Sequence, residues 1–169
     1  MKSVSSIIII AIVSLIIMWG CSYSFTGSSV PPHLKTIAIP TVKDKSNSGE
    51  PNLSNDLTQT LTQEFINDNS LYVVNSTTAD AILTVTVLSL QDRAEVVSGE
   101  KEKASDRRIT LRAKAVYKDL VMKKTIFEKD FSNYGIFKTD NYVENRQTAI
   151  QDAIDNVALD LLLAVVADW

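Results

Sequence analysis

The sequence is short of the residues from which most catalytic and metal sites are built. It contains one cysteine, Cys21, and one histidine, His33. These two side chains cannot supply the full ligand set of a structural zinc site, and no nucleophile motif accompanies His33 for a serine–histidine–acid triad. Carboxylates such as Asp80 and Asp92 have no spacing that marks an acid–base pair. We therefore predict that the protein is not an enzyme and uses no metal or cofactor.

An excess of positive charge is also missing. Lysine and arginine together number 17, against 20 aspartates and glutamates, so the net charge is −3. Domains that bind nucleic acid usually concentrate basic side chains. We therefore expect no nucleic-acid partner.

The apolar run at the start of the chain is too short for a comfortable transmembrane helix. Residues 7–19 include one polar residue, Ser14, and Lys2 precedes them. A helix of this length spans roughly 20 Å, whereas the bilayer hydrocarbon is about 30 Å thick. A buried element of the fold is the alternative. The N-terminal position and the polar residues that follow favour a signal peptide over residues 1–20.

The only cysteine directly follows this run. Met18-Trp19-Gly20-Cys21 resembles a bacterial lipobox, in which Leu, a small residue and Gly or Ala precede the cysteine. Gly20 and Cys21 match, whereas Met18 and Trp19 depart from the pattern. Cys21 has no internal disulfide partner. We predict that Cys21 is the lipid attachment site and carries acyl chains such as palmitate. Ser22 at the next position resembles signals that permit transfer to the outer membrane.

The remaining chain predicts one domain. Residues 21–34 contain Gly27, Pro31 and Pro32, which discourage regular structure, so they form a lipidated tether and lead-in. Residues 35–169 have the length of a single α+β domain. Apolar alternation predicts strands over residues 35–40, 71–75 (a short one), 81–97, 108–117 and 125–131, with loops at 98–106 and 134–141.

Two segments show helical spacing instead. Leu53, Leu57, Leu61 and Phe65 recur every four residues, and a second stripe begins after about Val143. The second stripe contains Ile150, Ile154, Val157, Leu161 and Val165. These elements predict a small mixed sheet of about four strands, with both helices packed on one face, in the order β-α-β-β-β-α.

The end of the second helix is more apolar than one buried face requires. Residues 161–167 are apolar on all sides, and a helix of this kind is buried all round. Burial under the lead-in segment is one explanation. Contact with a partner protein is the other, and it would use Leu162, Leu163 and Val166.

Several segments, in this order, resemble the LptE family of lipopolysaccharide-assembly lipoproteins. They are CSYSFTG at 21–27, PPHLKTIAIP at 31–40, LSNDLTQTLTQEFI at 53–66, DAIL at 80–83, FSNY at 131–134, and the closing helix that ends in Trp169. The resemblance implies a small sheet backed by two helices and a non-enzymatic role. It also implies an outer-membrane β-barrel partner, LptD-like, whose assembly the lipoprotein supports while lipopolysaccharide is inserted into the outer leaflet.

This resemblance leads to predictions about location, ligand and partner. We expect a lipid-anchored protein at the outer membrane that faces the periplasm or lies inside the partner barrel. Lipopolysaccharide carries phosphates, which exposed cations would contact. The candidates are Lys101, Lys103, Arg107 and Arg108, with Lys138 near them if its loop folds toward the same end. A solvated mixed-charge loop is the alternative, because acidic residues are interleaved there.

A second family type shares some of these signals. A strand that ends in proline, a polar loop, an amphipathic helix and a short Tyr-Val-Val strand also resemble other periplasmic lipoproteins. Those proteins activate a cell-wall synthase or build a secretion pore. This alternative function stays open at the level of the sequence.

Overall fold

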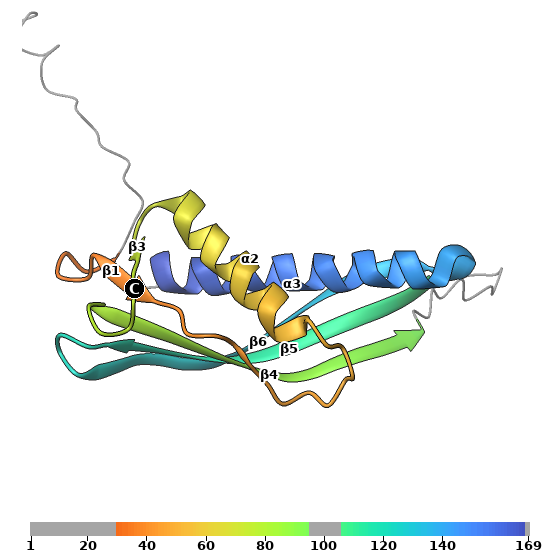
Figure 1. The fold of residues 1–169 in the computed structure, drawn as a ribbon, viewed down its shortest axis with the longest axis horizontal. Coiled ribbons are helices and arrows are strands. Elements are labelled where there is room, and N and C mark those ends of the chain that lie inside the picture. The colour runs from red at the N-terminus through yellow and green to blue at the C-terminus, as the bar shows by residue number, and fades with distance from the viewer. Residues whose placement is uncertain (1–29, 95–105, 168–169) are drawn as a thin grey trace, which may run out of the picture.

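Three long strands and two helices dominate the described part of the computed structural model, residues 30–94 and 106–167 (Figure 1). The strands are β1 (Thr36–Ala38), β2 (Lys43–Asp44), β3 (Tyr72–Val73), β4 (Ala81–Ala94), β5 (Asp106–Asp119) and β6 (Lys124–Lys138). The helices are α2 (Leu53–Asp68) and α3 (Tyr142–Val166), and a short 3-10 turn, η1 (Thr139–Asn141), precedes α3.

The strands form one mixed sheet in the order β3-β1-β4-β5-β6, and β2 also pairs with β4. The pairs that involve β1 and β2 are parallel, whereas β4, β5 and β6 form an antiparallel meander. The predicted α+β class and mixed sheet are confirmed. The described residues contain six strands rather than about four. β3 lies within the short strand predicted over residues 71–75, whereas β2 was not predicted, because its two residues are too few to show an alternation.

Both helices cover the same face of this sheet, as predicted (Figure 1). α3 lies along β5 and β6, and α2 packs on α3 beside β2 and β3. Each predicted stripe is fully buried: Leu53, Leu57, Leu61 and Phe65 on α2, and Ile150, Ile154, Val157, Leu161 and Val165 on α3. They meet alternate residues of β4 and β5, including Leu83, Val85, Leu111 and Tyr117.

One predicted loop is wrong. Residues 134–138 continue β6, so only residues 139–141 turn into α3. Gly135 falls within this expected loop, but its role in the structure is to allow the backbone of α3 to approach β6 closely. A Cβ built on Gly135 would lie 2.2 Å from the carbonyl oxygen of Ala149 on α3. The missing side chain therefore allows the helix backbone to lie directly on the strand.

The predicted signal peptide and Cys21 lie outside the described residues. So do Lys101 and Lys103 in the connection between β4 and β5. Across residues 30–94 and 106–167, no helix combines the length and apolarity needed to cross a membrane.

Candidate functional site

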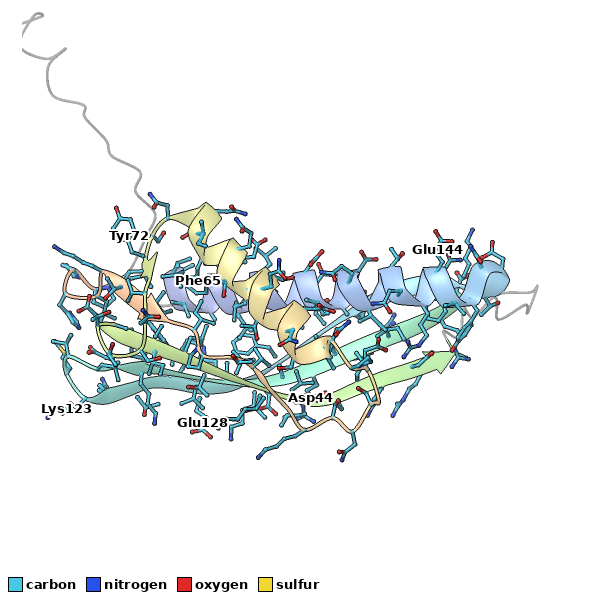
Figure 2. All side chains as sticks on the ribbon, in the orientation of Figure 1. Asp44, Phe65, Tyr72, Lys123, Glu128 and Glu144 are labelled. Atoms are coloured by element: carbon cyan, nitrogen blue, oxygen red, sulfur yellow. The ribbon has the colours of Figure 1, made fainter. Side chains whose placement is uncertain are left out.

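The open face of the sheet, away from the helices, presents side chains from alternate positions of the meander. The strand register aligns them in rows. The rows are Ile82–Lys118–Thr125, Thr84–Val116–Glu128, Thr86–Lys114–Asp130, Ser89–Arg112–Ser132, Gln91–Thr110–Tyr134 and Arg93–Arg108–Ile136. Figure 2 shows Glu128 on this side of the sheet. Threonines and charged residues thus make up much of a wet surface, as expected for a sheet with one solvated face.

Ion pairs neutralise the middle of this open face. Arg112 Nη2 lies 2.5 Å from Oδ2 of Asp130, and Lys114 pairs with Glu128. The hydrogen bond with Glu128 raises the pKa of Lys114. All four side chains are well exposed, so these pairs contribute little to stability. The middle rows therefore present polar groups whose charges balance.

At the far end of the open face, where β5 begins, basic side chains lie beside aromatic and apolar ones. The guanidinium carbon of Arg108 lies 4.0 Å from the ring centroid of Tyr134, a cation–π contact. Arg93 pairs with Arg108 in the register, and Tyr134 and Ile136 are both exposed. Lys138 lies opposite Asp106 in the strand register at this same end. We name Arg93, Arg108, Tyr134, Ile136 and Lys138 the hairpin-end patch.

Sequence reasoning found only part of this patch. Arg108 is among the predicted candidates, and Lys138 is expected near it only if its loop folds toward the same end. The register places Lys138 there, as the last residue of β6 rather than in a loop. Arg93, Tyr134 and Ile136 were missed, because Arg93 stood in a strand interior and the other two in a predicted loop. The alternation of β6, extended past Phe131, would have placed Tyr134 and Ile136 on the same face.

Arg107, in contrast, lies on the helix-covered side of the sheet. Its Nε donates to Oδ1 of Asp92 at 2.7 Å, and this hydrogen bond raises the pKa of Arg107. Tyr142 Oη donates to the other oxygen of Asp92 at 2.9 Å. Arg146 lies 3.7 Å from the same oxygen and 3.1 Å from Glu50. Arg107 is thus part of a network that joins the sheet to the start of α3, away from Lys138.

The three predicted interface residues at the end of α3 differ in their exposure to solvent. Leu162 and Val166 are buried, whereas Leu163 is 48% exposed. Leu159, one helical turn earlier, is also exposed. The predicted contact residues are therefore not one surface: Leu159 and Leu163 face outward, and Leu162 and Val166 belong to the core of the domain.

Charge is distributed unequally between the two layers. α2 and α3 carry seven carboxylates and one basic side chain, Arg146. β4, β5 and β6 carry nine basic and five acidic side chains. The chain as a whole is acidic, but the sheet layer is cationic. An anionic partner is therefore favoured by the sheet rather than by the helices.

The lead-in segment is fastened to the opposite end of the sheet. His33 Nε2 lies 2.7 Å from Oδ2 of Asp119, and Asp80 accepts hydrogen bonds from the Thr36 hydroxyl and from two backbone N–H groups. Burial alone raises the pKa of Asp119, but the hydrogen bonds with His33 and the Met122 N–H outweigh it and lower the pKa. The Lys35 N–H makes the largest contribution to lowering the pKa of Asp80.

Metal binding finds no support among these groups. Within the described ranges, no cluster of three or more His, Cys, Asp or Glu side chains could hold a metal ion. His33 has a structural partner, Asp119. The fold and its surfaces define a class: an α+β domain with two helices on one sheet face and an open, cationic face on the other.

The family follows from a direct comparison. The model of the LptE lipopolysaccharide-assembly family matches residues 34–165, and the chain belongs to this family. This is a family of non-enzymatic assembly lipoproteins. No curated protein sequence matches the chain at a significant level.

Solved structures share the fold at low sequence identity. A hypothetical protein from Chlamydia trachomatis is 8% identical with a TM-score of 0.60, and the match covers 78% of this chain and 95% of that one. Lipoprotein B from Nitrosomonas europaea is 15% identical with a TM-score of 0.59 and coverages of 88% and 92%. The PelC dodecamer from Paraburkholderia phytofirmans is 9% identical with a TM-score of 0.56 and coverages of 83% and 95%.

Proposed function

We propose that this protein is a lipid-anchored outer-membrane lipoprotein that partners an LptD-like β-barrel. In this role it supports the assembly of the barrel and the insertion of lipopolysaccharide into the outer leaflet. The observation that carries the proposal is the family match over residues 34–165. Residues 1–20 act as the signal peptide, 21–34 as the lipidated tether and lead-in, and 35–169 as the single domain.

The hairpin-end patch supports a direct contact with lipopolysaccharide. The ligand combines phosphates with acyl chains, so its recognition needs cations beside apolar side chains. Arg93, Arg108 and Lys138 lie beside Tyr134 and Ile136, a combination that suits such a ligand. Lys101 and Lys103, in the adjoining connection, extend the same proposal.

Arg107 has a different part in this proposal. Its guanidinium is held by Asp92, which also accepts a hydrogen bond from Tyr142 at the start of α3, so Arg107 belongs to the network that joins the hairpin end to this helix. A charge reversal at Arg107 would break this network as well as any ligand contact. Lys101, Lys103 and Lys138 are therefore the sharper set to reverse.

Ligand binding should be measured on the detergent-solubilised lipoprotein. Replacing Lys101, Lys103 and Lys138 with Glu should weaken lipopolysaccharide binding, and the wild type should bind less tightly as salt rises. A triple reversal at Lys35, Lys43 and Lys45 changes the net charge equally and provides the control. If both variants bind lipopolysaccharide as tightly as the wild type, these lysines do not contact the ligand. The lipoprotein would then act only as a scaffold that supports the barrel.

The partner is tested by affinity purification of the tagged lipoprotein from solubilised outer membrane. Recovery of a lipopolysaccharide-exporting barrel supports the proposal. Recovery of a cell-wall synthase or a pore ring would instead support the alternative function. The likeness to the PelC dodecamer is a likeness of fold, and it makes a ring of copies worth testing in the same experiment.

Lipidation has its own prediction. Cys21→Ala should leave the chain without its lipid, either unprocessed or released from the membrane, because no other cysteine can replace it. Mass spectrometry of the mature N-terminus provides the measurement. An unmodified Cys21 in the wild-type protein would contradict the proposed anchor.

A further inference from the structure

The turn between β5 and β6 has an apolar tip. Leu120, Val121 and Met122 are 37%, 56% and 65% exposed. They follow Asp119, the last residue of β5, and Lys123 completes the turn before β6 begins at Lys124. Three successive large apolar side chains thus project from one end of the sheet.

The geometry of the turn does not require these side chains. The Asp119 carboxylate accepts a hydrogen bond from the Met122 N–H at 2.7 Å, and the Leu120 N–H donates to the carbonyl oxygen of Asp80 at 2.8 Å. Lys123 has a φ of 54°, a position where Gly or Asn is favoured. Backbone groups and Asp119 therefore build the turn, and polar residues would fill its exposed positions equally well.

Three lysines flank this tip in the sequence. Lys118, Lys123 and Lys124 are exposed, and none of them is paired with a carboxylate in the part of the chain that the structure describes. The neighbouring carboxylates of Asp80 and Asp119 are held in internal hydrogen bonds. An apolar tip flanked by exposed lysines is the composition of a segment that enters a phospholipid surface, because the apolar groups reach the acyl chains while the ammonium groups contact phosphates.

The tip lies beside the segment that leads to the proposed anchor. The contact between His33 and Asp119 joins the lead-in directly to the residue that begins the turn. Nine residue steps separate Cys21 from Val30, a reach of at most about 30 Å. In Figure 2, Lys123 lies at the β1 end of the molecule and Glu144 at the opposite end. A lipid on Cys21 would therefore hold the tip, rather than the hairpin-end patch, close to the bilayer.

We propose that residues 118–124 dock on the phospholipid surface that carries the lipid anchor. Val121 and Met122 enter the boundary between headgroups and acyl chains, and Lys118, Lys123 and Lys124 contact lipid phosphates. This inference rests on the proposed lipidation of Cys21. It places the hairpin-end patch at the other end of β5, whose 14 residues span about 45 Å.

A single thiol can test the docking. When Cys21 carries the lipid, Met122→Cys introduces the only free thiol, which can carry an environment-sensitive fluorophore. The lipidated protein is reconstituted in vesicles of phosphatidylethanolamine and phosphatidylglycerol. Val143→Cys is the matched control, because Val143 is also apolar and exposed but lies at the start of α3, near Glu144 at the other end.

We expect a blue-shifted emission at position 122 that is quenched by lipid-borne quenchers, and a water-like emission at position 143. Replacing Lys118, Lys123 and Lys124 with Gln should lower the ratio of docked to undocked tip by roughly 100-fold on anionic vesicles. Water-like emission at both positions would overturn the docking. Protection of position 122 only when the barrel is present would also overturn it, in favour of a protein contact.

Failure of the anchor and failure of the docking give different results. The wild-type protein without an added cysteine should not react with the thiol dye. Labelling of the wild type would show a free Cys21 and contradict the lipidation. An unlabelled wild type together with a water-exposed position 122 would contradict the docking alone.

Discussion

The two faces of the β4–β5–β6 meander are made by alternate residues of the same strands, yet they differ in almost every physical property. The covered face includes Leu83, Val85, Leu111 and Tyr117, which are fully buried under the helices. The open face holds threonines, ion pairs and exposed cations. The comparison teaches that the covered face fixes the fold, whereas the open face is free to serve a ligand or partner.

The largest effect should come from the covered side. Leu161→Ala removes a fully buried side chain from α3 and should cost roughly 2–5 kcal/mol in the free energy of unfolding. Leu163→Ala, two positions later and 48% exposed, should change it by about 0.5 kcal/mol or less. Urea titration measures both. Similar losses for the two variants would show that Leu163 is packed in the same way.

A second test compares the faces within β6. Gly135→Val would force side-chain atoms into the Ala149 backbone and should cost about 1–3 kcal/mol. Ser132→Val places the same side chain at an exposed position of the open face and should be nearly neutral. Thermal unfolding followed by circular dichroism separates the two. If Gly135→Val is as stable as the wild type, α3 does not lie directly on β6.

The loss of stability in acid should distinguish two aspartates, Asp119 and Asp130, with a smaller effect than the core substitutions above. The pKa of Asp119 is lowered in the folded state, so its contribution to stability is present above its ordinary pKa of about 3.8 and is lost as the pH falls through the folded value. Asp119→Asn should therefore weaken the protein near neutral pH and flatten its loss of stability in acid. Asp130→Asn, in an exposed pair on the open face, is the control. An unchanged acid profile in Asp119→Asn would count against the pairing with His33.

The smallest effect should come from the open face itself. Arg112→Ala breaks the exposed pair with Asp130 and should change stability by less than about 0.5 kcal/mol. Chemical denaturation at low and high salt provides the measurement. A loss above about 1 kcal/mol would mean that the open face also contributes to the fold.

Much of the fold could be predicted because burial leaves a period in the sequence. Leu53, Leu57, Leu61 and Phe65 recur at helical spacing, and all four are buried. The residues of β5 alternate with period two between covered and open faces. β2 could not be predicted in this way, because a two-residue strand has no period, whereas β3 lies within the short strand predicted over residues 71–75.

The candidate site was harder to predict because its residues come from three strands. Arg107 and Arg108 are adjacent in sequence, but the pleat sends them to opposite faces, where one meets Asp92 and the other meets Tyr134. Gly135 gave a loop signal, although it marks the close contact of α3 with β6. Such cases depend on what lies across the sheet, which no local pattern contains.

The sequence by itself determined the class of the domain, its two helical stripes, the shortage of catalytic side chains and the family resemblance. These properties are local or compositional, so they can be counted along the chain. Only the tertiary structure decided the partners of His33, Arg107 and Arg108, and the position of the β5–β6 turn beside the lead-in. The physical reason is that strand register and helix packing join residues far apart in the chain, and a shift of one residue would exchange the two faces of the sheet.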